Sequence, residues 1–123
     1  MELKINEPPR VFNPHEDIIL KDIGEVVLED NEQLTFKTKS GKKNDIVKKE
    51  WGFYLSNSLN CNLKKKGFKT ALVVSYASNP PGTFLNLVEV EKMDLFKKYL
   101  SDFNSKIICW LDEWDLEEKK KGL

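Results

Sequence analysis

One hairpin signal constrains the fold more than any other feature of the sequence. The run from Phe68 to Tyr76 is the most apolar in the chain and is rich in β-branched side chains, which favours a central strand. Asn79-Pro80-Pro81-Gly82 forces a turn directly after it, and the run from Thr83 to Val90 returns with similar apolar character. The pattern predicts the strongest antiparallel hairpin of a sheet.

A long amphipathic helix is predicted after this hairpin, over Glu91 to Asn104. Its apolar side chains recur at helical spacing and form one stripe, which consists of Met93, Leu95, Phe96, Tyr99, Leu100 and Phe103. This stripe is the largest apolar surface available to cover the sheet. We therefore expect it to pack in the core and not to bind a partner.

Several shorter runs alternate apolar and polar side chains and predict further strands, at residues 17–22, 25–30, 33–38, 45–51 and 106–111. Turn residues at 40–45 favour a hairpin between the third and fourth of these runs. Leu59 and Leu63, between Asn57 and Gly67, predict a short helix. The predicted fold class is α+β: a mostly antiparallel sheet of about six to seven strands, with one amphipathic C-terminal helix and one short helix packed on it.

The composition of the two terminal segments predicts the domain organisation. Three prolines remove backbone donors and predict an irregular N-terminal arm over residues 1–16: Pro8, Pro9 and Pro14. Residues 17–111 are predicted to form a single α+β domain, because 123 residues with 40% hydrophobic side chains support one core. Residues 112–123 are predicted to be a charged C-terminal tail, with solvated carboxylates at Asp112, Glu113 and Asp115.

No segment of the sequence has the pattern of a secretion signal or a membrane span. The N-terminus lacks an apolar region, and no stretch approaches about 18 uncharged apolar residues. Cys61 and Cys109 lie far apart, without the spacing of a metal site or a disulfide framework. We therefore predict a cytoplasmic protein with reduced thiols and with no membrane association, metal or cofactor.

Charge is distributed unevenly, although the formal net charge is zero. Residues 37–69 contain ten lysines and two acidic residues, a local charge of +8 that the rest of the chain balances. Such a segment attracts anions, and it includes aromatic rings that can stack on a sugar or a base. Asn and Ser can bind hydroxyls, and lysines can neutralise phosphate. The predicted ligand-binding residues are Trp51, Tyr54, Asn57, Asn60, Lys64, Lys65 and Lys66.

A structural interpretation of the same residues stays open. Trp51, Phe53 and Tyr54 are equally typical of core and hairpin aromatics, and the lysines of solvated strand faces. No catalytic residue is predicted. His15 is the only histidine, and Cys61 has cationic neighbours but no base that the sequence identifies.

Five pieces of the chain resemble a group of short bacterial proteins of unassigned activity: WGFY (51–54), LKKKGFKTALV (63–73), LVEV (87–90), DLFKKYL (94–100) and CWLDEW (109–114). That group is associated with surface-polysaccharide and sugar-nucleotide gene clusters. The resemblance spans most of residues 20–115. It implies a sugar-nucleotide context and names no catalytic residue.

These observations lead to one main hypothesis. The chain is expected to be a non-catalytic binding or accessory domain, homo-oligomeric, that recognises an anionic small molecule such as a nucleotide sugar, or a protein partner. One alternative is a small sugar- or nucleotide-modifying enzyme in which Tyr54, Cys61 or His15 assists proton transfer. A single-stranded nucleic-acid binder is a second alternative, which the zero net charge disfavours. A third alternative requires no ligand. In it, the lysine-rich segment of one subunit binds the acidic remainder of another, which gives an oligomer.

Overall fold

The computed structural model describes residues 1–15 and 18–115, apart from the side chain of His15. The contacts within the chain define two compact units. Unit 1 consists of Met1–Leu34 and Ile46–Tyr54, and unit 2 consists of Thr35–Asp45 and the described residues from Leu55 onward. The single domain expected over residues 17–111 stays a prediction.

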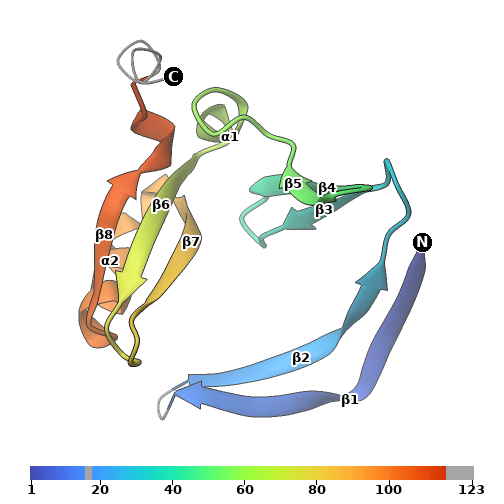
Figure 1. Cartoon of the computed structure of the whole chain (residues 1–123), viewed down its shortest axis with the longest axis horizontal. Coiled ribbons are helices and arrows are strands. Elements are labelled where there is room, and N and C mark those ends of the chain that lie inside the picture. The colour runs from blue at the N-terminus through green and yellow to red at the C-terminus, as the bar shows by residue number, and fades with distance from the viewer. Residues whose placement is uncertain (16–17, 116–123) are drawn as a thin grey trace. The chain divides into compact units, whose positions relative to one another are not determined.

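The described residues form eight strands and two α-helices (Figure 1). The strands belong to three sheets, with the orders β1-β2, β3-β4-β5 and β7-β6-β8. The predicted α+β class, with its C-terminal helix and its short helix, is confirmed. The elements are β1 Glu2–His15, β2 Ile18–Val27, β3 Gln33–Lys37, β4 Lys43–Lys49, β5 Gly52–Leu55, α1 Asn62–Lys65, β6 Phe68–Ser75, β7 Gly82–Glu89, α2 Met93–Asp102 and β8 Ser105–Trp110. A 3-10 turn, Val90–Lys92, leads into α2, and another, Leu111–Glu113, follows β8.

The core of unit 2 lies between α2 and the β7-β6-β8 sheet. Strand β6 is central and pairs antiparallel with both neighbours, as its apolar run predicts. Helix α2 joins β7 to β8 and covers one face of this sheet (Figure 1). Leu100 of α2 packs against Ala71 and Val73 of β6, and the rings of Phe96 and Trp110 lie against this cluster. Each large side chain that is buried contributes about 1.5–3 kcal/mol.

Two members of the predicted apolar stripe lie outside this core. Leu95 is 65% exposed, and Tyr99 is also exposed. A sheet of three strands offers α2 a narrow surface, so only the part of the stripe that includes Phe96 and Leu100 is covered. The stripe is therefore narrower than the sequence pattern indicates.

The N-terminal residues form strand β1 and not the predicted irregular arm. The ladder between β1 and β2 is interrupted twice, between Ile5 and Arg10 and between Phe12 and His15. The three prolines of this segment, at positions 8, 9 and 14, lie inside those two interruptions. A proline lacks the N–H donor, but no ladder hydrogen bond is lost where none is made. The interruptions of the ladder therefore accommodate all three prolines. The expected arm is thus one long strand with two irregularities.

The residues after β8 are not solvated in the way that the sequence pattern suggested. Asp112 has a fully buried side chain, and its Oδ1 accepts a hydrogen bond of 2.9 Å from the backbone N–H of Thr70. The Lys69 ammonium donates to Asp112 Oδ2 at 3.1 Å and to Glu113 Oε1 at 2.7 Å. Lys69 also lies over the Trp110 ring, 4.8 Å from its centroid. The predicted tail therefore begins with an anchored turn, and its residues 116–123 lie outside the described part of the chain.

We expect Asp112→Ala to lower the free energy of unfolding by about 3 kcal/mol, because it leaves the Lys69 ammonium and the Thr70 N–H without their buried acceptor. Urea denaturation followed by circular dichroism measures this cost. Glu113→Ala is the matched control. The Glu113 side chain is largely exposed, so its loss should cost less than about 1 kcal/mol. Equal losses of unfolding free energy in the two variants would contradict the anchoring role of Asp112.

The same network predicts a loss of stability in acid. Burial raises the pKa of Asp112, but the hydrogen bonds from Thr70 and Lys69 outweigh it and hold the pKa below its ordinary value of 3.8. The unfolded chain therefore takes up the proton first as the pH falls. The contribution of Asp112 is complete above pH 3.8 and is lost as the pH drops through the lower folded pKa. The free energies of unfolding of wild type and Asp112→Asn, measured between pH 6 and about pH 2, should converge at the acid end of this range.

Candidate functional site

A small pocket in unit 2 is lined by the turn after β3 and by the end of α1. Its volume is about 260 Å³, and its lining residues are Ser40, Gly41, Lys42, Lys43 and Lys66. No acidic residue is among the described residues that line it. Three lysines on two separate segments therefore converge on one hollow.

The first wall of the pocket is a tight turn between β3 and β4. The Thr38 N–H donates to the Lys42 carbonyl at 2.9 Å, and the Gly41 N–H donates to the Thr38 carbonyl at 3.0 Å. The Thr38 hydroxyl lies 2.7 Å from the Ser40 hydroxyl and accepts a hydrogen bond from the Lys42 N–H. Gly41 has φ +92°, a conformation that side chains disfavour. The turn thus places Lys42 and Lys43 side by side at the start of β4.

The second wall is the end of α1. Leu63 is fully buried and anchors this single helical turn, while the neighbouring lysines remain exposed. Gly67 follows with φ +91° and ends the helix. The Lys42 side chain lies so close to Gly67 that a Cβ atom added there would meet its Nζ at 2.8 Å. The glycine therefore lets the two walls approach each other.

The lysines of the pocket differ in how firmly they are paired. The Lys42 ammonium is 3.9 Å from Glu91, and the Lys66 ammonium is 3.7 Å from Asp45. Both separations are long for an ion pair, and each pair has one exposed partner, so each is worth roughly 0–1 kcal/mol. Lys43 has no ion pair within the described part of the chain. An anion that enters the pocket displaces little existing interaction.

The carboxylates around the pocket are held in the charged form. The Ser40 hydroxyl donates to Glu89 at 2.5 Å, and this bond, with help from Lys92, lowers the pKa of Glu89. Hydrogen bonds from Thr35 and Asn57, together with Lys66, lower the pKa of Asp45. Groups with lowered pKa values accept protons poorly near neutral pH. Glu89 thereby holds the turn through Ser40, and Asp45 stays charged beside Lys66.

The predicted site residues fall in both units. Trp51 and Tyr54 belong to unit 1, where the two rings stack with centroids 6.0 Å apart and are 71% and 43% exposed. Asn57 in unit 2 is buried, and its side chain accepts from the Asp45 N–H at 2.8 Å and donates to Asp45 Oδ2 at 3.1 Å. That the predicted residues form one site stays a prediction.

The remaining predicted residues lie at or beside α1. Asn60, Lys64 and Lys65 are exposed, and Lys66 is the one predicted residue that lines the pocket. The other four lining residues form the sequence Ser-Gly-Lys-Lys at 40–43, which the pattern indicated only as a turn. The adjacent lysines in this glycine-containing turn are the sequence feature from which these lining residues could have been predicted.

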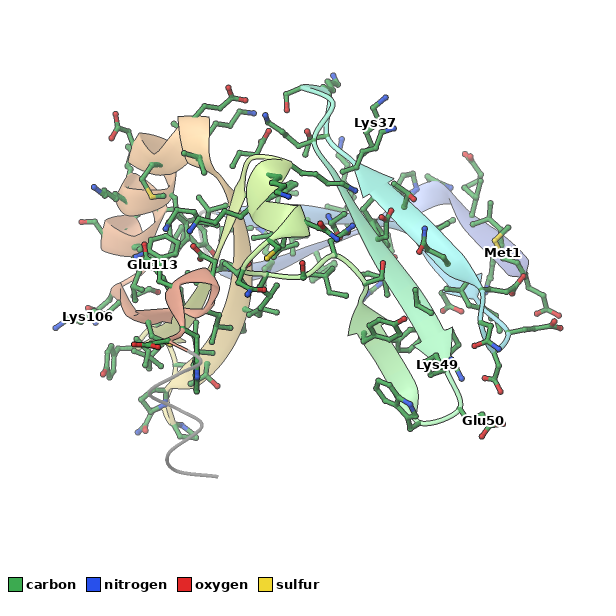
Figure 2. The ribbon with its side chains drawn as sticks, turned by 90° about the horizontal axis from the view of Figure 1, so that it is seen from above. Met1, Lys37, Lys49, Glu50, Lys106 and Glu113 are labelled. Carbon is green, nitrogen blue, oxygen red and sulfur yellow. The ribbon has the colours of Figure 1, made fainter. Side chains whose placement is uncertain are left out.

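Not all the lysines of the +8 segment contribute to the pocket. Lys48 pairs with Asp30 at 3.0 Å, and Lys49 bonds to Asn31, both within unit 1. Lys49 and Glu50 lie at the turn between β4 and β5 (Figure 2). Lys69 is engaged by Asp112 and Glu113, as described above. The positive segment is therefore divided among several local interactions.

The residues considered for proton transfer have no catalytic partners among the described side chains. Neither the Tyr54 hydroxyl nor the Cys61 thiol has a hydrogen-bond partner there, and Cys61 is exposed. His15 belongs to β1, but its side chain lies outside the described part. Over the described residues, no group of three or more His, Cys, Asp or Glu side chains is placed to hold a metal ion. None of the described helices has the length and the apolar run that a bilayer span requires.

Comparisons with protein-family models, with curated proteins and with solved structures find no match to this chain.

Proposed function

We propose that this chain is a non-catalytic domain that binds a small phosphorylated molecule, with nucleotide sugars as the ligand class. The observation that carries the proposal is the pocket of unit 2, where Lys42, Lys43 and Lys66 converge and no described carboxylate lines the wall. Lysine ammonium groups are compact donors that bind phosphate as point charges. The pocket therefore has the chemistry of a phosphate subsite.

The size of the pocket limits what it can take. Its volume of about 260 Å³ is slightly below the range of roughly 300–1,000 Å³ that encloses a whole drug-sized ligand. A phosphate or diphosphate group fits that volume, and the rest of a larger ligand would lie outside it. We infer that the anionic end of the ligand is what the pocket recognises.

Binding is favoured over catalysis by the state of the nearby acids. Ser40 is the only hydroxyl that lines the pocket among the described residues, and it already donates to Glu89. The lowered pKa of Glu89, caused first by this hydrogen bond, makes that carboxylate a weak base at neutral pH. A Ser40–Glu89 pair therefore suits positioning of the turn better than proton abstraction.

The exposed Trp51–Tyr54 pair of unit 1 is a separate candidate binding surface. Two stacked rings open to solvent provide a surface on which a base or a sugar ring can stack, worth about 1–3 kcal/mol per base. These rings belong to unit 1. The test of the lysine pocket does not depend on them, and Trp51→Ala tests them separately.

We expect Lys43→Ala to weaken the binding of inorganic pyrophosphate and of a uridine diphosphate sugar about tenfold, because one charge-assisted contact is lost. Calorimetric titration at low and at high salt measures the affinity. Lys43 suits the test because its ammonium makes no ion pair in the described part, so the change leaves the fold intact.

Lys106→Ala is the matched control. Lys106 is an exposed lysine of β8 whose side chain points outward from unit 2 (Figure 2). This variant removes the same charge from another strand and should bind like wild type. Absence of heat with both probes at low salt, or equal weakening by the two changes, would contradict the proposal.

A further inference from the structure

Strands β1 and β2 form a two-stranded ribbon (Figure 1). Many of its apolar side chains are exposed. Ile19, Ile23 and Val27 of β2 are 65%, 68% and 54% exposed. In the described part of the chain, every buried hydrophobic side chain belongs to unit 2, and unit 1 has none. Because an isolated two-stranded hairpin is at best marginally stable in water, this ribbon needs further strands beside it or a surface packed on it.

The two long edges of the ribbon differ in their ability to pair. Strand β1 carries three prolines and two interruptions, features that protect an edge from further pairing. Strand β2 carries no proline, and no strand in the described residues pairs with its outer edge. The outer edge of β2 therefore presents unpaired backbone groups to another strand.

The sequence of β2 is complementary to itself in the antiparallel direction. When Ile23 faces Ile23 of a second copy, Lys21 faces Glu25 and Ile19 faces Val27. On the opposite face of the sheet, Leu20 then faces Val26. Two-fold symmetry makes each of the unlike pairs occur twice. Opposite charges and paired aliphatic side chains both stabilise neighbouring strands.

Neighbouring registers lose this match. If the two-fold axis moves by one residue to Asp22, Lys21 faces Ile23 and Ile19 faces Glu25. If it moves to Gly24, Glu25 faces Ile23 and Lys21 faces Val27. Each shift sets charged groups against aliphatic side chains on the same face, which forfeits both kinds of stabilising pair. Charge complementarity thus selects the register centred on Ile23.

We propose that two copies of this chain join through the outer edges of β2, antiparallel and centred on Ile23, to give a continuous sheet in the order β1-β2-β2-β1. The interaction completes the hydrogen bonding of the free edge, and it pairs the exposed aliphatic side chains of the ribbon across the two copies. It is independent of the proposed ligand pocket, since it uses residues of unit 1 only.

Sedimentation velocity tests the charge pairing. Wild type should dimerise, and Lys21→Glu should raise the dimer dissociation constant about tenfold or more, because it sets like charges opposite each other at two positions. Adding Glu25→Lys should restore the dimer. Since Glu25 also faces Lys4 within the ribbon, the restored variant carries Lys4→Glu as well. Lys106→Glu on β8 is the control and should dimerise like wild type.

Cysteine cross-linking tests the register independently, in a Cys61→Ser background that removes the exposed native thiol. Ile23→Cys should form an intermolecular disulfide on air oxidation, because facing residues of antiparallel strands have Cα atoms about 4.5–5.5 Å apart. Ile19→Cys should not, because its counterpart would lie eight residues along the sheet, about 27 Å away. Folded wild type that stays monomeric at all concentrations, or faster cross-linking at position 19 than at 23, overturns the proposal.

Discussion

The buried carboxylate of Asp112 is the interaction on which the arrangement of unit 2 depends. Strand β8 pairs with β6 as far as Ala71 and Trp110, and then the chain turns away. The Asp112 carboxylate takes the next donor along β6, the Thr70 N–H, and also binds the Lys69 ammonium. The ladder is thereby continued by a side chain past the point where the strand ends. This fixes the end of β6 that follows α1.

The geometry of the lysine-lined pocket depends on that fixed end of β6. Phe68 is buried at the start of β6, and Gly67 just before it accepts a hydrogen bond from the Val90 N–H at 2.9 Å. Lys42 lies over Gly67, and Lys66 precedes it in the chain. A displacement of the start of β6 would therefore separate the lysines that line the pocket. Stability of the sheet and the proposed recognition of an anion therefore depend on the same short segment.

The sequence predicted those elements whose signals are local. The strands β6 and β7 and the helix α2 follow from apolar periodicity and a proline turn, which involve residues close together in the chain. Strand β1 was missed because a proline excludes a regular ladder but not a bulged one. The burial of Asp112 was missed because its partners, Lys69 and Thr70, lie more than 40 residues away in the sequence. Lys66 was predicted as a site residue, but its meeting with Lys42 and Lys43 depends on tertiary structure that no local pattern encodes.

The two units differ in the burial of their apolar side chains. Unit 2 contains all the buried hydrophobic residues of the described chain, so it can hold a pocket by its own core. Unit 1 exposes comparable side chains on a two-stranded ribbon, which needs further strands or a packed surface for independent stability. The outer edge of β2, without prolines and with a self-complementary sequence, supplies the backbone groups through which the proposed dimer would extend this ribbon to four strands.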